Sequence, residues 1–351
     1  MSKVLIAMSG GVDSAVSAYL IKDAGYEAIG ATMRLYCPCN EKSANDPGDE
    51  MADARAVARH VGIEHTVLDY EKDFRSLVIE PFVKEYEAAK TPNPCVFCNE
   101  TLKFGKMMDA ANALGAEYLA TGHYARIERD GSGRYLLRRA ADPAKDQSYV
   151  LYHLTQAQLS KILFPLGEYS KARVREIAQA LGFGNAQKGD SQDICFIPDG
   201  DYAAFIKRYT GKQYPAGDFI SEDGTVLGRH QGMIHYTVGQ RKGLGIALGR
   251  PVFVSRKDPI SNTVTLADNE ALFSRELYVK KTNWIPFDRL HGSLHVQAKI
   301  RYNMAAQPAV VEQVDDGRVC VRFDQPQRAI TPGQSAVFYD GEYVVGGGII
   351  E

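Results

Sequence analysis

The chain has 351 residues, of which 45% are hydrophobic and 24% charged, and its formal net charge is −2. This composition is typical of a globular protein with two or three domains, and the slight negative charge excludes a protein that coats nucleic acid non-specifically. The sequence has no apolar stretch long enough for a membrane span and no signal-peptide pattern. We therefore expect a cytoplasmic protein whose six cysteines are mostly reduced.

The first motif in the chain predicts a phosphate-binding loop. An apolar run at residues 4–8 leads into the hexapeptide SGGVDS at 9–14, and a helical pattern follows at 15–24. Backbone N–H groups at such a strand-to-helix turn converge on an anion, and Gly10 and Gly11 let the backbone approach it closely. No Gly-Lys-Ser/Thr closes the loop and G-x-G-x-x-G is absent, so it is neither a Walker loop nor a Rossmann fingerprint.

Strand-like and helix-like segments alternate over the first half, which predicts an α/β domain at 1–205 with a parallel sheet and crossover helices. Asp49 is expected to cap one of these helices and Gly62 to end it. We predict strands at 27–35, 63–68 and 118–121, helices at 51–61, 100–114 and 171–181, and a hairpin at 126–139 around a turn at 130–133.

The remaining sequence predicts two β domains. Short glycine-punctuated strands predicted at 228–232 and 237–243 indicate a small, mostly β central domain at 206–272. Apolar alternation predicts five or six antiparallel strands forming a C-terminal β-barrel at 273–351. Within this barrel we expect strands at 294–300, 309–314, 319–323 and 336–339, and earlier in the chain a long loop at 36–48.

The cysteines suggest redox or sulfur chemistry. Cys95 and Cys98 form a C-x-x-C pair just before the helix predicted at 100–114, where the helix dipole is expected to lower both thiol pKa values. Cys195 follows a polar segment that turns abruptly apolar. A lone buried cysteine is usually a small hydrophobe, and we expect this of Cys320.

Cys37 and Cys39 form a C-x-C pair near the predicted loop. No further His or Cys nearby completes a tetrahedral zinc set, so we expect this pair to be exposed and non-essential.

Five segments together resemble the bacterial tRNA-specific 2-thiouridylase family of the ATP pyrophosphatase superfamily. The resemblance implies an adenine nucleotide alpha hydrolase-like N-terminal domain and an enzyme that replaces oxygen by sulfur at the 2-position of the wobble uridine. In that reaction ATP adenylates the oxygen and a sulfur nucleophile then displaces AMP. The segments are 9–14, 93–104, 121–126, 145–149 and 190–196, and further matches at 237–244 and 301–302 extend the resemblance over nearly the whole chain.

The resemblance also implies roles for individual residues. In the family's mechanism Cys195 carries a persulfide, and Cys98 resolves it by forming a disulfide with Cys195. The implied partners are ATP with Mg²⁺, the anticodon arm of tRNA, and a sulfur donor protein or hydrosulfide, with the protein acting as a monomer. The implied ATP-binding residues are Ala7, Met8, Ser9, Gly10, Gly11, Val12, Asp13, Ser14, Met33 and Gly122. Asn93, Pro94 and Cys95 would line the target base, and Lys145, Asp146, Gln147, Arg301 and Tyr302 would contact tRNA.

One position departs from the family pattern, in which many members carry Asp where this chain has Cys95. Three thiols, on Cys95, Cys98 and Cys195, with an open fourth position suit a 4Fe–4S cluster whose free iron binds hydrosulfide. We therefore expect cluster-dependent sulfur transfer in preference to the persulfide route. The competing functions are an ATP pyrophosphatase ligase acting on a small molecule and a non-enzymatic sulfur or iron–sulfur scaffold.

A tRNA partner also requires phosphate contacts. Local basic clusters could together line a groove for the anticodon arm, while His123 is expected either to contact a base or nucleotide or to serve as a structural hydrogen-bonding residue. The clusters are Arg138 and Arg139 with Lys145, Lys171 with Arg173 and Arg175, Arg241 with Lys242, and Lys280 with Lys281.

Overall fold

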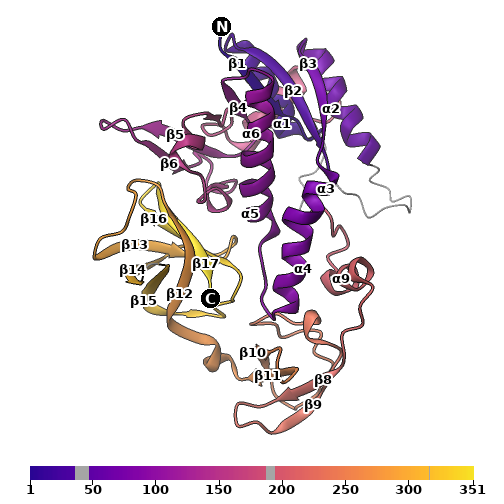
Figure 1. Cartoon of the computed structure of the whole chain (residues 1–351), viewed down its shortest axis with the longest axis vertical. Helices are drawn as coiled ribbons and strands as arrows, with labels where there is room; N and C mark the ends of the chain where they lie inside the picture. The colour runs from indigo at the N-terminus through magenta and orange to yellow at the C-terminus, as the bar shows by residue number, and fades with distance from the viewer. Residues whose placement is uncertain (36–46, 187–193, 316) are drawn as a thin grey trace.

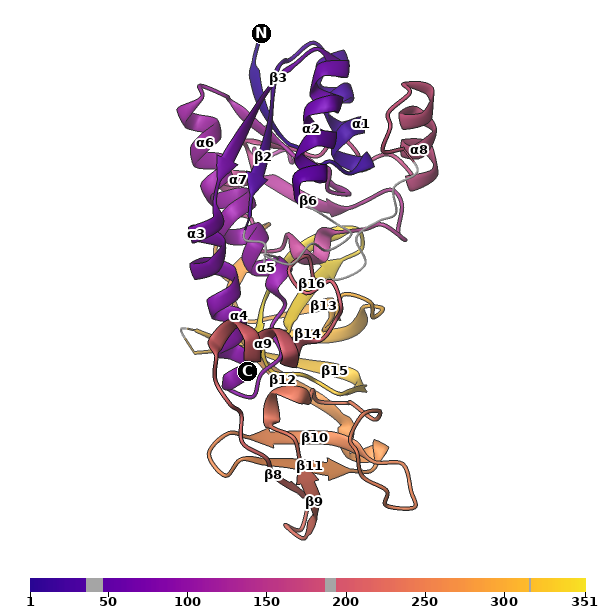
Figure 2. The ribbon, with the colours of Figure 1, turned by 90° about the vertical axis from the view of Figure 1, so that its right-hand side faces the viewer.

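The computed structural model describes residues 1–35, 47–186, 194–315 and 317–351, so Cys37 and Cys39 lie outside the described residues. The molecule is elongated. The N-terminal α/β domain forms one end, the central β domain the other, and the C-terminal barrel lies between them (Figures 1 and 2). Within the described residues, no helix has the length and apolar character needed to cross a bilayer.

A five-stranded parallel sheet with the order β3-β2-β1-β4-β7 forms the centre of the N-terminal domain, as the sequence predicts. Side chains of its central strand, β1 (Lys3–Ala7), alternate between two apolar clusters, with Val4 and Ile6 in one and Leu5 in the other. From β1 the chain adds β2 and β3 on one side of the sheet and then β4 on the other, so the strand order reverses between β1 and β4. Open α/β sheets bind ligands at the carboxyl ends of the strands at such a point. The other strands are β2 (Glu27–Arg34), β3 (Glu64–Asp69), β4 (Tyr118–Ala120) and β7 (Ile162–Leu163).

Helices cover both faces of this sheet. The helix predicted at 51–61 begins earlier, at Pro47, so Asp49 lies inside the helix and not at its cap. Proline suits the first turn of a helix because its missing N–H would have no partner there. The flanking helices are α1 (Val12–Asp23), α2 (Pro47–Val61), α6 (Met107–Ala113), α7 (Gln156–Leu159) and α8 (Lys171–Ala180).

Two helical rods run from the sheet toward the rest of the molecule, and each has a π-helical middle (Figure 1). The second rod begins at Pro94, six residues before the predicted start, because the Asn93 side chain caps it by accepting from the backbone N of Cys95. The cysteine pair therefore lies within α5 and does not precede the helix, with Cys95 in the first turn and Cys98 as the last residue. The first rod comprises α3 (Glu71–Phe74), η1 (Arg75–Ile79) and α4 (Glu80–Glu87), and the second α5 (Pro94–Cys98), η2 (Asn99–Lys106) and α6.

The hairpin predicted at 126–139 is present as β5 (Ala125–Arg129) and β6 (Tyr135–Arg139). It does not extend the parallel sheet. Instead β6 pairs with the last strand of the barrel, β17 (Tyr343–Ile350), so that an eight-stranded sheet links the first and last domains.

The central domain is a four-stranded sheet with the order β10-β11-β8-β9. The strand expected at 237–243 is a turn, which corrects the prediction. Gly239 and Gly243 have φ angles of +90° and +72°, in a left-handed region that a strand does not use. The strands are β8 (Gly217–Ile220), β9 (Val226–His230), β10 (Phe253–Asp258) and β11 (Thr263–Ala267).

The C-terminal domain is an antiparallel barrel, as predicted, closed by pairing of its first strand with its last. Its interior holds one apolar cluster that includes Leu277, Val311 and Phe338. The strands are β12 (Phe273–Trp284), β13 (Ser293–Lys299), β14 (Gln307–Asp315), β15 (Arg318–Arg328), β16 (Ser335–Asp340) and β17. The remaining helices are η3 (Ser148–Val150), α9 (Tyr202–Thr210), η4 (Met233–His235) and η5 (Asn269–Leu272).

Candidate active site

Hydroxyl groups hold the loop between β1 and α1 in a defined conformation. Gly10 has a φ of +76°, and Gly11 precedes α1 as its N-cap. The Ser14 hydroxyl accepts from the backbone N of Ser9 at 3.2 Å and donates to the Gly11 carbonyl at 2.9 Å. The loop thus presents the exposed Ser9 and the positive end of α1 to solvent, an arrangement suited to a phosphate group.

The residues predicted to bind ATP lie at the carboxyl ends of the adjacent strands β2, β1 and β4. Gly122 packs directly on the loop, since a Cβ there would lie 3.1 Å from both the Asp13 carbonyl carbon and the Ser14 backbone N. Met33 is the second-last residue of β2 and is partly buried. The fold therefore brings these residues together at one edge of the sheet, and their contact with ATP stays a prediction.

Three residues that the sequence did not assign to this site also contact the loop. The buried Lys171 ammonium donates to both carboxylate oxygens of Asp13 at 2.8 Å, and the Tyr124 hydroxyl donates to one of them at 2.7 Å. The Asn185 side-chain amide donates to the Gly10 carbonyl at 2.8 Å. No local pattern could reveal these contacts, because Lys171 lies 158 residues after Asp13 in the chain.

The cysteines approach one another from two segments of the chain. Cys95 is exposed in the first turn of α5, Cys98 is half-buried at the end of that helix, and Cys195 is exposed. The residue after Cys195, Phe196, is buried and packs edge-on against the Phe82 ring with 5.4 Å between ring centroids. Cys98 packs against the same apolar cluster, which therefore holds the two segments together.

The surroundings of the three thiols disfavour their ionised forms. Burial raises the pKa of Cys95 and Cys98, and it raises the pKa of Cys195 to about 12, with a further contribution from the other two thiols. The positive charge of Lys103 opposes each of these pKa shifts. The predicted lowering of the thiol pKa is thus wrong, because desolvation of the sulfur atoms by surrounding protein outweighs the helix dipole even though two of the residues keep exposed surface.

Among the described residues, no group of three or more His, Cys, Asp or Glu side chains could hold a single metal ion. Cys95, Cys98 and Cys195 carry free thiols, and the first two act electrostatically on the third. The predicted four-iron cluster on these residues stays a prediction. Cys320 is buried in β15, as predicted for an inert side chain.

Several residues predicted to contact tRNA lie where the first domain meets the barrel. The Tyr302 hydroxyl donates to the Asp146 carbonyl at 3.3 Å, and the Cys95 thiol lies near enough to raise the pKa of Tyr302 further, after burial and Asp146. The Gln147 side chain accepts from the backbone N of Tyr124 at 3.0 Å. Asp146 and Gln147 therefore shape this loop from within, and Tyr302 connects the loop with the cysteine site.

Arg301 braces the barrel against the central domain. One guanidinium nitrogen donates to the carbonyls of Val238 at 3.2 Å and Ala329 at 2.8 Å, and to the hydroxyl of Thr331 at 2.7 Å. Lys145, the remaining predicted tRNA contact, is half-buried in the loop before Asp146. Contact of either residue with tRNA stays a prediction.

Two further candidate contact residues are engaged with neighbouring side chains. The His123 ring nitrogen Nδ1 lies 2.7 Å from the Thr121 hydroxyl, and burial holds the pKa of His123 well below its usual value, which favours the structural role. Arg138 forms ion pairs with Glu128 and Glu342.

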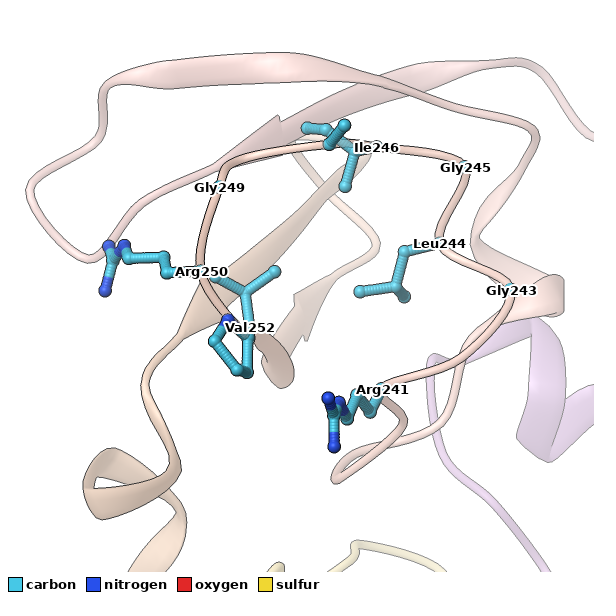
Figure 3. A pocket seen from close by; sticks show the side chains of 10 residues that line it. Arg241, Gly243, Leu244, Gly245, Ile246, Gly249, Arg250 and Val252 are labelled. Carbon is cyan, nitrogen blue, oxygen red and sulfur yellow. The ribbon is translucent and has the colours of Figure 1, made fainter.

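An open hollow of about 600 Å³ lies in the central domain, at the far end of the molecule from the phosphate loop (Figures 1 and 3). Leu244, Ile246 and Val252 line it together with Arg241. The hollow is therefore not part of the candidate active site, but it places Arg241 on an accessible surface.

Three family models match successive parts of the chain: the tRNA methyl transferase HUP domain at residues 2–199, the tRNA methyl transferase PRC-barrel domain at 203–268, and the aminomethyltransferase beta-barrel domain at 274–350. Among solved structures, a 4-thiouridine synthetase in complex with RNA and ATP is 14% identical with a TM-score of 0.35, covering 60% of this chain and 50% of that one. An NMN synthetase from Francisella tularensis is 17% identical with a TM-score of 0.33, covering 61% and 79%. Likenesses this weak carry no functional argument.

Curated relatives match over the full length of the chain. The tRNA-specific 2-thiouridylase of Lachnoclostridium phytofermentans is 48% identical, covering 100% of this chain and 99% of the relative. The enzyme of the same name from Clostridioides difficile is 49% identical, covering 99% and 98%, and that from Clostridium acetobutylicum is 49% identical, covering 99% of each. The chain therefore belongs to the tRNA-specific 2-thiouridylase family.

Proposed function

We propose that this protein, as a tRNA-uridine 2-sulfurtransferase of its family, uses ATP to exchange the 2-oxygen of the wobble uridine for sulfur. The observations that carry the proposal are the match to a family relative at 48% identity over the full length and the presence in this chain of a phosphate loop and a paired-thiol site within one domain. The two sites correspond to the two half-reactions.

In the first half-reaction the 2-oxygen of uridine attacks the α-phosphorus of ATP and pyrophosphate leaves. The loop at 7–14 would hold the phosphates, with Met33 and Gly122 completing the nucleotide site. Mg²⁺, when bound, would neutralise the departing pyrophosphate. The product is an adenylated base in which AMP has become the leaving group.

In the second half-reaction the terminal sulfur of a persulfide on Cys195 attacks the activated carbon, and AMP departs with the former oxygen of the base. The Cys98 thiolate then attacks the Sγ of Cys195, which releases the thiolated base and leaves a Cys98–Cys195 disulfide for an external thiol to reduce. The shared apolar cluster beneath Cys98 and the Cys195 segment supports this pairing. Asn93, Pro94 and Cys95 would face the target base.

The alternative route, delivery of hydrosulfide by a 4Fe–4S cluster on the three cysteines, has no supporting geometry among the described residues. Anaerobic purification with iron, sulfide and visible absorbance measurements separates the routes. We expect colourless, iron-free protein that still thiolates tRNA when given a persulfide donor. A brown protein whose activity is lost with its iron would establish the cluster route instead.

AMP release tests the proposed function against its rivals. We expect AMP to form only when tRNA is present, accompanied by 2-thiouridine detected by mass spectrometry. AMP formed with a metabolite and no tRNA would indicate a small-molecule ligase, and absence of turnover with either would indicate a scaffold. The sulfur donor, the monomeric state and the cytoplasmic location stay predictions.

A further inference from the structure

A partly buried ion pair joins α8 to the phosphate loop, with 32% of the Asp13 side chain exposed. Lys171 is the first residue of α8, which packs beside α1 (Figure 2). Only 9% of the Lys171 side chain is exposed, and its ammonium donates at 2.8 Å to each carboxylate oxygen of Asp13. The sequence grouped Lys171 with a basic surface for tRNA, which does not account for this position.

Each partner is also held by other contacts. The backbone N of Lys171 donates to the Asp142 carboxylate at 3.1 Å, and Ser170 caps α8 by accepting from the backbone N of Arg173 at 3.2 Å. The Tyr124 hydroxyl donates to Asp13 at 2.7 Å. The pair is therefore a fixed part of the loop, unlike an exposed surface ion pair, whose partners move freely.

Arg173, two residues after Lys171 on the same helix, is exposed and differs from Lys171 in this respect. Arg173 pairs with Glu176 one turn on, and the two side chains are 61% and 62% exposed. Arg173 therefore fits the predicted basic surface, whereas Lys171 is turned into the domain toward Asp13.

The charge of Asp13 explains why a buried lysine is needed. Asp13 lies in the first turn of α1, where the partial positive charge of the helix faces the phosphate site. A bare carboxylate at this point would repel the phosphate oxygens of a nucleotide. Lys171 cancels that charge and leaves the helix N-terminus to act on the phosphates.

We propose that Lys171 is a positioning residue of the ATP site, which neutralises and orients Asp13 so that the loop can accept the triphosphate of a nucleotide. The inference rests on the proposed ATP chemistry and deepens it. Lys171 thus belongs to the nucleotide site and not to the surface predicted to bind tRNA.

Equilibrium binding of a non-hydrolysable ATP analogue with Mg²⁺, and separately of tRNA, tests this assignment. Lys171→Met is expected to weaken nucleotide binding roughly 10- to 100-fold while tRNA affinity changes less than about twofold. Lys171→Arg, which keeps the charge, should regain most of the affinity. The matched control is Lys161→Met, because Lys161 is an exposed lysine that bonds to Asn112, and it should change neither affinity.

The double variant Asp13→Asn/Lys171→Met separates charge from packing. If the lysine acts by neutralising Asp13, the double variant binds the nucleotide more tightly than Lys171→Met alone, because no bare carboxylate remains. Lys171→Gln loses the charge but keeps a polar side chain, and it supplies the same comparison if the methionine variant does not fold.

Unchanged nucleotide affinity in the uncharged variants, equal losses of nucleotide and tRNA affinity, or a double variant no better than Lys171→Met would each overturn the assignment. Failure of the proposed function has a different signature, since the wild-type protein itself would then bind no nucleotide or release no AMP with tRNA.

Discussion

Cys98 packs against the apolar cluster that also holds Phe196, the residue after Cys195, and both thiols are protonated by preference because burial raises their pKa. A protonated thiol is a poor nucleophile. In the proposed mechanism the attacking atom is therefore the outer sulfur of a persulfide on Cys195 and not a resting thiol.

Serine substitutions at the two cysteines should uncouple the half-reactions. We expect Cys98→Ser and Cys195→Ser each to reduce formation of 2-thiouridine by roughly a thousandfold while the affinity for ATP stays within about twofold. The measurement is single-turnover thiolation beside equilibrium ATP binding. Cys320→Ser, at a buried cysteine in the barrel, is the control and should keep thiolation activity. Full activity of either site variant would contradict the proposed pairing.

Among the elements, the start and the middle of the second helical rod contribute differently to the candidate site. Its start holds the cysteines, with Pro94 in the first turn and Asn93 as the cap, and its middle is π-helical. π-helical turns are frequent at functional sites because they change which residues share a helix face. Here the π segment carries Lys103, whose charge acts on all three thiols.

Removing the cap should loosen the cysteine site. Asn93→Ala deletes the acceptor for the backbone N of Cys95 and is expected to lower the free energy of unfolding by about 1 kcal/mol. Thiolation should fall by more than the affinity for ATP, because the change lies on the sulfur side of the site. Asn93→Asp, which can still cap, should restore the unfolding midpoint; a midpoint equal to that of the alanine variant would argue against capping.

Lys257, in β10, makes the stability of the folded protein depend on pH. Burial lowers the pKa of Lys257 to about 8, while its ammonium donates to the Tyr236 carbonyl at 2.9 Å. Between pH 8 and the unfolded value of 10.5 the folded protein releases a proton that the unfolded chain retains, so stability rises with pH over this range. Below pH 8 Lys257 is charged in both states, so the full cost of burying its ammonium lowers the stability of the folded protein.

Lys257→Met removes this penalty. We expect the variant to be more stable than the wild type at pH 7, by about 2 kcal/mol, and the difference to shrink as the pH approaches 10. Urea unfolding of both proteins between pH 7 and 10 measures it. A difference that stays constant with pH would show that Lys257 titrates normally in the folded state.

On the scale of the whole molecule, the candidate active site depends on contacts between domains. The backbone N of Thr91, just before the cysteine rod, donates to the Pro332 carbonyl of the barrel, and the Gln334 side chain donates to the Thr91 carbonyl. Arg301 ties the barrel to the central domain through Val238. The barrel is thus a support that fixes where the cysteine rod begins.

The central domain offers a separate test of tRNA contact. Arg241→Glu, at the hollow shown in Figure 3, is expected to weaken tRNA binding roughly three- to tenfold and to reduce the dependence of binding on salt, with the affinity for ATP unchanged. Filter binding over a range of salt concentrations measures both quantities. Lys161→Glu, in the first domain, is the matched charge reversal. An unchanged tRNA affinity in Arg241→Glu would remove Arg241 from the interface.

The sequence predicts the structural features that a local residue pattern encodes, but it does not reveal those that depend on contacts between residues far apart in the chain. Alternation and apolar runs located the parallel strands and the barrel, because burial imposes those periods directly. The turn at 237–243 was mistaken for a strand, since a left-handed glycine leaves no periodic signal. The partner of Asp13 was missed for a related reason: a lysine at the start of a helix looks like a surface charge until the fold brings it to the loop.

If ATP adenylates the base, the oxygen that leaves the base departs as part of AMP, and isotope transfer tests this step most directly. A tRNA substrate carrying ¹⁸O at the 2-position of its wobble uridine is thiolated, and the AMP is examined by mass spectrometry. We expect one ¹⁸O in the phosphate of AMP for each 2-thiouridine formed. Thiolated tRNA with unlabelled AMP would contradict adenylation of the base.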